Sequence, residues 1–104
     1  MKKTVVAMLI AVAFIPASNA GRSHKTTLTT VIVKTTHIEL YTSSGTNACS
    51  QANRWHLLNA HGNFEAMYSG LLSAAHSGAD VDIVGTGNCD GAGEEIHWAY
   101  VLRP

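Results

Sequence analysis

The sequence predicts a small, mainly β domain with one helix and one disulfide. Segments rich in β-branched residues, or alternating between apolar and polar residues, flank a single segment whose apolar residues recur every three or four positions. The chain contains two cysteines, Cys49 and Cys89, which allow one intramolecular pair. Together these observations predict a mainly β fold with one helix.

The start of the chain predicts an export signal. Two lysines precede the apolar run Thr4–Ile15, and small residues stand at the −3 and −1 positions of a cut after Ala20. The run is short for a membrane span, and no second apolar segment follows it. We therefore expect a bacterial signal peptide over 1–20, a single domain over 21–104, and a periplasmic or secreted protein.

The predicted mature chain excludes some partners. It carries five basic and seven acidic residues, a net charge of −2. It has no basic stripe for nucleic acid and no Lys/Arg cluster for an anionic membrane surface. A domain of this size has a limited core, and an oxidising compartment would allow Cys49 and Cys89 to pair. A reactive thiol pair is the alternative, but the spacing is not C-x-x-C.

The strands and the helix follow from local patterns. The helix is expected over 64–77, with Asn63 as N-cap, Glu65 in the first turn and Gly78 as terminator. Its apolar stripe, expected to face the core, comprises Phe64, Met67, Tyr68, Leu71, Leu72 and Ala75. Strands are expected over 26–36, 37–42, 54–58, 80–85 and 94–102, the last with Ile96, Trp98, Tyr100 and Leu102 on one face.

The element order β-β-β-α-β-β favours a small five-stranded OB-fold barrel, in which a helix lies between the third and fourth strands. An open α+β sandwich is the alternative. The glycine-rich segment 84–95 lacks a complete dinucleotide, Walker or calcium motif. It is therefore expected to be a flexible hairpin connection held by Cys89.

A second face of the predicted helix is rich in small residues. Such a face either packs on the domain's own sheet or contacts the helices of other subunits, and the sequence leaves both readings open. Gly70 lowers helix propensity by about 1 kcal/mol relative to alanine, so close packing is its expected reason. The face comprises Ala66, Ser69, Gly70, Ser73, Ala74 and Ser77.

Six histidines raise the question of a metal or catalytic site. None has His-x-x-x-His or Cys-His ligand spacing, and no nucleophile motif is present. Strands 54–58 and 94–102 could bring His56 and His97 together, which would be the basis of an enzyme. The favoured expectation is no enzyme, no metal and no cofactor.

Two segments, "ACSQANRW" and "FEAMYSGLLSAAHSGADVDI", resemble the binding subunits of subtilase cytotoxin and typhoid toxin. The likeness covers residues 48–83. It rests on Ala48-Cys49-Ser50, Trp55, Tyr68 with Leu71, Gly78, and Val81 with Ile83.

The resemblance implies an OB-fold subunit that forms a homopentameric ring with helices around a central pore. It further implies binding of sialylated or related host glycans and a separate catalytic toxin chain seated on the pore. Five weak sites acting together would supply avidity. A periplasmic protein-interaction or inhibitor domain without a sugar site is the alternative.

The expected glycan-binding residues are hydroxyl and aromatic side chains near the first strand and the following loop: Thr29, Thr30, Tyr41 and Ser44. Hydroxyls match sugar hydroxyls, and an aromatic face matches the apolar side of a pyranose. The sequence departs from the family in three places, one of which is a shorter C-terminus. The family's second-strand cysteine is absent at Leu40–Tyr41, and its tyrosine after the V-x-I strand is replaced by Gly85.

Overall fold

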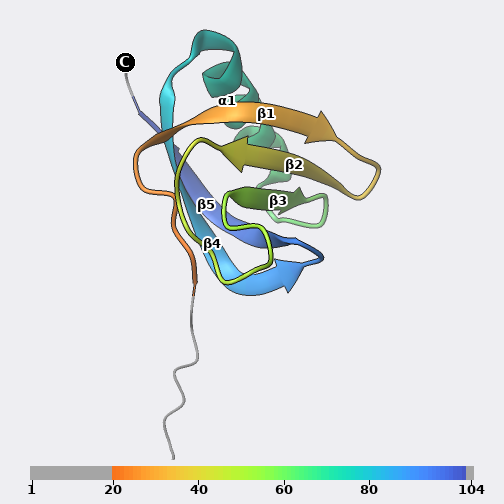
Figure 1. The fold of residues 1–104 in the computed structure, drawn as a ribbon. Helices are drawn as coiled ribbons and strands as arrows, with labels where there is room; N and C mark the ends of the chain where they lie inside the picture. The colour runs from red at the N-terminus through yellow and green to blue at the C-terminus, as the bar shows by residue number, and fades with distance from the viewer. Residues whose placement is uncertain (1–19, 103–104) are drawn as a thin grey trace, which may run out of the picture.

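Five strands and one helix follow one another in the expected order (Figure 1). The structure, a computed structural model, describes residues 20–102, so nearly all of the predicted signal peptide lies outside the described residues. The elements are β1 (Thr26–Val33), β2 (His37–Thr42), β3 (Arg54–Leu58), α1 (Phe64–Ser77), β4 (Asp80–Asp90) and β5 (Gly93–Val101). The mainly β composition with one helix is thus confirmed.

The five strands form one sheet that closes on itself in the order β1-β2-β3-β5-β4. Closure needs β1 to pair with β4 as well as with β2, and both pairings are antiparallel. The remaining junction, between β3 and β5, is parallel and short: Trp55 pairs with Glu94, and His56 pairs with Glu95. This parallel seam brings two charged β5 residues next to β3.

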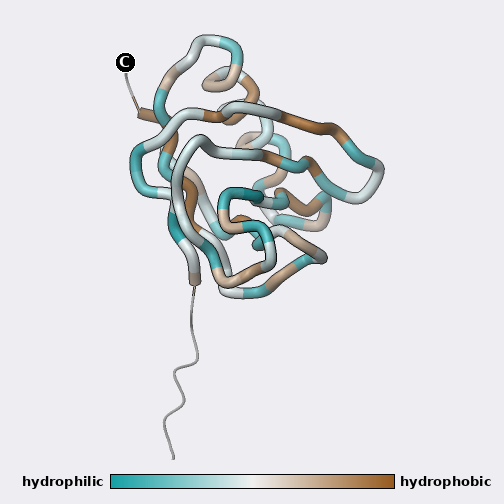
Figure 2. The backbone as a smooth tube through the Cα atoms, in the orientation of Figure 1, coloured by the Kyte–Doolittle hydropathy of each residue, from teal (hydrophilic) through white to brown (hydrophobic). Residues whose placement is uncertain are grey.

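The core lies inside the closed sheet and beneath α1. Its largest buried side chain is Trp55, whose indole N–H donates to the Thr42 hydroxyl at 3.2 Å. The hydrophobic stretch at the end of β1, brown in Figure 2, is not part of this core, because Ile32 and Val33 are exposed. The buried apolar residues are Ile38, Leu40, Trp55, Leu57, Leu71, Ala74, Ala79, Val81, Ile83 and Ile96.

The predicted bounds of α1 are confirmed, but its start differs in detail. Asn63 makes no side-chain capping bond. Instead, the Asn63 backbone N–H donates to His61 Nδ1 at 2.9 Å, and Phe64 N–H donates to the His61 carbonyl. Gly78 ends the helix in the left-handed conformation (φ 75°), as predicted for a residue without a Cβ.

The faces of α1 only partly match the prediction. Leu71 is buried, whereas Leu72 is 44% exposed. Ala74, predicted for the small-residue face, lies in the core, and a Cβ on Gly70 would lie 3.7 Å from Val101 Cγ2. Part of that face therefore packs on the domain's own sheet. The other four members, Ala66, Ser69, Ser73 and Ser77, are exposed.

The expected alternation along β5 is wrong beyond Ile96. Gly85 pairs with Ile96 while the adjacent Val84 pairs with Trp98, so His97 is an extra residue in β5. Such a bulge reverses which side chains point inward. Ile96 consequently lies in the core, while Trp98 is 43% exposed and Tyr100 is also exposed.

The glycine-rich segment is mostly strand, which corrects the expected flexible connection. β4 continues to Asp90, and only residues 91–92 form the turn before β5. Irregular pairing between Gly85 and Cys89 accommodates the glycines, and Gly91 has the positive φ (65°) that this tight turn requires. β1 in turn ends at Val33, three residues earlier than predicted.

The predicted disulfide is confirmed. Cys49 and Cys89 are joined across 40 residues of sequence and connect the loop before β3 to β4. Gln51 N–H donates to the Ala92 carbonyl, which holds the same loop to the β4–β5 turn. Among the helices of residues 20–102, none has the length and apolar character needed to cross a membrane.

We expect the double variant Cys49→Ser/Cys89→Ser to lose about 3–4 kcal/mol of unfolding free energy, because the disulfide restricts the unfolded chain. Urea denaturation of the oxidised protein and the variant measures the difference. Reduced wild-type protein is the control and should match the variant. A difference below about 1 kcal/mol would contradict a stabilising role for this disulfide.

Candidate functional site

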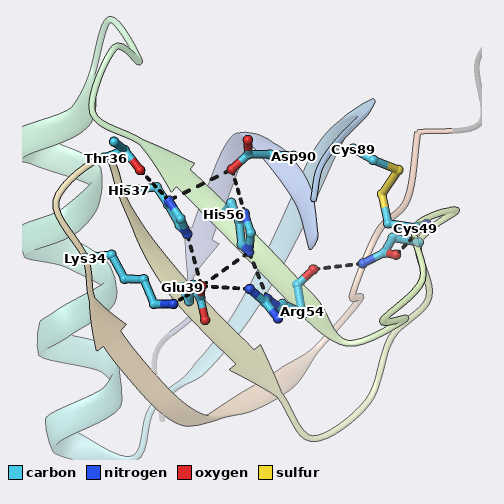
Figure 3. A network of polar contacts seen from close by, with 10 residues as sticks. Lys34, Thr36, His37, Glu39, Cys49, Arg54, His56, Cys89 and Asp90 are labelled. Atoms are coloured by element: carbon cyan, nitrogen blue, oxygen red, sulfur yellow. Dashed lines mark hydrogen bonds and ion pairs between the residues drawn. A yellow bond between two sulfur atoms is a disulfide. The ribbon is translucent and has the colours of Figure 1, made fainter. Parts of the chain in front are cut away.

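A cluster of charged and imidazole side chains covers the outer face of β2 and β3 (Figure 3). His37 and Glu39 come from β2, and Arg54 and His56 come from β3. Lys34 from the β1–β2 connection and Asp90 from the end of β4 complete the set, which we call the polar cluster. Ile38 and Leu40 alternate with the β2 members and point into the core, so strand periodicity assigns the two faces.

Glu39 is the centre of the polar cluster and is only 2% exposed. One of its oxygens, Oε2, lies 2.7 Å from Arg54 Nη2, 3.2 Å from Lys34 Nζ and 3.1 Å from His37 Nε2. Burial by itself raises the pKa of Glu39, but hydrogen bonds from His37 and Lys34 and the charge of Arg54 together lower it to about 2. Glu39 is therefore a carboxylate that fixes the two cationic side chains.

His56 is also 2% exposed and lies directly opposite Glu39 in the β2–β3 ladder. Arg54 Nε donates to His56 Nε2 at 2.9 Å, so that nitrogen is an acceptor and the proton of the neutral ring is on Nδ1. Nδ1 then donates to Asp90 Oδ2 at 2.8 Å. Burial lowers the pKa of His56, the hydrogen bond to Asp90 partly opposes this, and nearby His37 and Arg54 lower it further.

Three potential metal ligands converge in the polar cluster. Donor atoms of His37, Glu39 and His56 all lie within 4.8 Å of one another. Each donor atom is already engaged, however, and Arg54 and Lys34 place two positive charges against the Glu39 oxygen. A metal ion would be repelled by these cations, so the geometry favours an ion-pair network over a metal site.

The accessible part of the polar cluster carries both signs of charge beside an aromatic ring. The Lys34 and Asp90 side chains are about half exposed, and part of Arg54 reaches the surface. The Arg54 guanidinium lies 5.8 Å from the centroid of the Tyr41 ring. This surface offers hydrogen-bond donors, acceptors and an apolar ring face to a polar ligand.

Of the four residues expected to bind glycan, Thr30 pairs with Tyr41 in the β1–β2 ladder, whereas Ser44 lies in the loop after β2. Tyr41 alone lies beside the polar cluster. Thr29 and Thr30 instead line a hollow of about 260 Å³ between β1 and α1, with Leu72 on its other wall, and Thr29 Oγ1 also donates to the Tyr41 carbonyl at 3.2 Å. Ser44 directs its hydroxyl to Thr26 Oγ1 at 3.0 Å.

The alternative in which His56 and His97 meet is also not observed. The His56 ring stacks on His37 with centroids 4.2 Å apart. His97 is exposed, packs on Trp98 and accepts a hydrogen bond from His61 Nε2 at its carbonyl. The sequence did contain a signal for the observed pair: His-x-Glu on β2 and Arg-x-His on β3 each place two polar side chains on one face.

Comparison of this chain with protein-family models, with curated protein sequences and with solved structures finds no match. A function for this chain must therefore be argued from the geometry of its fold and of the polar cluster.

We expect Glu39→Gln to lower the unfolding free energy by about 2 kcal/mol at pH 7, because a neutral amide leaves Arg54 and Lys34 without their buried partner. The pKa of Glu39 is about 2 in the fold against 4.5 ordinarily, so its contribution is complete above pH 4.5 and is lost as pH falls toward 2. The wild-type and variant curves of stability against pH should therefore converge in acid.

Both proteins should also lose stability as pH falls below 6.5. The pKa of His56 is lower in the fold than in the unfolded chain, so below pH 6.5 protons bind the unfolded chain more readily and favour unfolding. Urea denaturation at a series of pH values gives both results. The matched control is Glu65→Gln, at an exposed position of α1. A wild-type advantage over Glu39→Gln that is constant from pH 7 to pH 3 would contradict the assigned role of Glu39.

Proposed function

We propose that this protein is an exported OB-fold subunit that binds glycans and acts as an oligomeric ring. The closed strand order β1-β2-β3-β5-β4, with α1 between β3 and β4, supports the OB-fold assignment. OB-folds bind oligosaccharides and oligonucleotides on the face of strands 2 and 3 and on the loops between strands 1–2 and 4–5. The net charge of −2 of the predicted mature chain, residues 21–104, disfavours the oligonucleotide.

The observation that carries the proposal is the position of the polar cluster. Its members come from β2, β3, the β1–β2 connection and the end of β4, which are the elements that OB-folds use for ligands. Asp90 Oδ1 and the guanidinium N–H groups of Arg54 that Glu39 and His56 do not engage offer an acceptor and donors to sugar hydroxyls, and Tyr41 offers a ring face for a pyranose. Lys34 adds an exposed cation that suits the carboxylate of a sialylated glycan.

The binding site that we propose therefore differs from the first expectation. Tyr41 is kept, whereas Ser44 lies outside the polar cluster and donates its hydroxyl to Thr26 Oγ1. Thr29 and Thr30 are assigned to the hollow beside α1 and not to the sugar site. The binding role needs no catalytic group.

An exposed apolar surface supports the oligomer. Trp98, Tyr100 and Val101 follow one another along β5, and each exposes more than 40% of its surface. A hollow of about 200 Å³ joins Trp98 and Val101 to Ala66 and Gly70 on α1. Exposed apolar residues of this size are typical of protein interfaces. We assign it to contacts between copies in a five-membered ring that carries a catalytic toxin chain.

The same apolar surface favours one other function, that of a monomeric periplasmic interaction or inhibitor domain. In that case the surface binds a single different protein, and the polar cluster is only structural. The native mass of the mature protein distinguishes the two functions.

We expect the oxidised mature protein to bind sialylated oligosaccharides on a glycan array. Tyr41→Ala and Asp90→Ala should each weaken binding of sialyllactose by about 10-fold or more, since each removes a ligand contact. Isothermal titration measures the affinities. Ser44→Ala is the matched control and should bind as wild type. Loss of binding in Ser44→Ala with no change in Tyr41→Ala would overturn the assignment, as would a folded wild-type protein that binds no glycan.

We expect light scattering to give the native mass of a pentamer. Trp98→Ser/Val101→Thr should yield smaller species, because it removes apolar area from the interface between copies. The control is Leu72→Ser, which changes an equally exposed apolar residue outside that surface. A wild-type monomer would contradict the ring and favour the interaction domain.

A further inference from the structure

Glu94, at the parallel seam, is a buried carboxylate that the polar cluster does not use. Its exposed fraction is 0%. Oε2 accepts from the backbone N–H groups of Gly21 at 2.8 Å and Gly87 at 2.9 Å. Oε1 has no hydrogen-bond partner, and within residues 20–102 no basic side chain forms an ion pair with Glu94. The group is thus held on one oxygen and unpaired on the other.

A buried carboxylate without a cation is costly, because desolvation removes water that no opposite charge replaces. Buried charges in proteins are normally paired. A positively charged group close to Oε1 and Oε2 would therefore stabilise Glu94 in this position.

The segment that begins at Gly21 is fixed tightly against the sheet. Gly85 N–H donates to the Gly21 carbonyl at 2.9 Å, Arg22 exchanges backbone hydrogen bonds with Thr46, and Ser23 N–H donates to the Ile83 carbonyl. A Cβ at position 21 would lie 2.6 Å from Asn47 Cα and from the Thr46 carbonyl oxygen. Only glycine fits there, so the nitrogen of residue 21 is held in place next to Glu94.

We infer that Glu94 is the receptor for the α-ammonium group of the processed chain. The predicted cut after Ala20 hydrolyses the Ala20–Gly21 peptide bond, and the freed Gly21 amine takes up a proton. The single N–H donor 2.8 Å from Oε2 becomes an ammonium with three donors, which satisfies Oε2 and reaches toward Oε1. Cleavage thereby creates a buried ion pair that residues 20–102 of the uncleaved chain do not contain.

The consequence is a fold that becomes fully stable only after processing. In the uncleaved chain, Gly21 offers one neutral N–H group, and residues 20–102 supply Glu94 with no cation. The precursor is therefore easier to unfold than the mature protein, which suits a chain that is exported before it folds. This inference rests on the predicted cut after Ala20 and is independent of glycan binding.

The test compares synthetic residues 21–104 with a free amino terminus and with an acetylated one. The acetyl group occupies the place of the Ala20 carbonyl and Cα, which the structure accommodates, so the comparison removes only the charge. The free amine should raise the folding equilibrium constant by about 10- to 100-fold, the value of a charged hydrogen-bonded pair. Urea denaturation of both oxidised chains measures the ratio.

Glu94→Gln in both chains completes a double-mutant cycle and should abolish the ratio. Glu95→Gln, which changes the adjacent β5 residue, is the control and should preserve it. Equal stabilities of the free and acetylated wild-type chains would overturn the inference, as would a ratio that survives Glu94→Gln.

A second measurement needs no variant and covers the case in which Glu94→Gln does not fold. The α-amine of the folded wild-type chain should react with acetic anhydride at least about 10-fold more slowly than that of the urea-unfolded chain, since a paired ammonium is a poor nucleophile. Equal rates would place the amine in solvent and contradict the inference.

Discussion

The closed sheet depends on the short parallel seam between β3 and β5, where Trp55 and His56 pair with Glu94 and Glu95. So few backbone pairs give little stability by themselves, and side chains on both sides reinforce the seam. On the outer face His56 bonds to Asp90, and toward the N-terminal segment Glu94 bonds to Gly21. The Cys49–Cys89 disulfide fixes the loop that leads into β3. Closure of this small domain therefore relies on buried polar groups as much as on the apolar core.

The same interactions also position the polar cluster, on which the proposed function depends. The ion pairs that hold Glu39 and His56 orient Arg54 and Asp90, so a ligand would meet side chains that are already ordered. The apolar surface of β5 exists because the bulge at His97 turns Trp98 and Tyr100 outward. The two surfaces come from different strands, so the proposed glycan site and the proposed interface between copies do not overlap.

Local patterns in the sequence were sufficient to predict the helix and most strands, but they were not sufficient to predict the polar cluster. The bounds of α1 and β2, and the Cys49–Cys89 pair, were predictable because periodicity, capping and cysteine count act within short windows. The outward rotation of Trp98 was not predictable, since it follows from a bulge that depends on pairing with β4. The polar cluster was missed because His37 and His56 meet only through strand register. Candidate hydroxyls such as Ser44 gave no sign that they bond within the domain.

The most direct test of the central claim is a chemical-shift map of the ¹⁵N-labelled mature protein during titration with sialyllactose. If the β2–β3 face binds glycan, the amide shifts will concentrate at residues 37–41, at Arg54 and around Asp90, and they will saturate. Saturating shifts confined to the hollow of Thr29 and Thr30, or no shifts at millimolar sugar, would contradict the account.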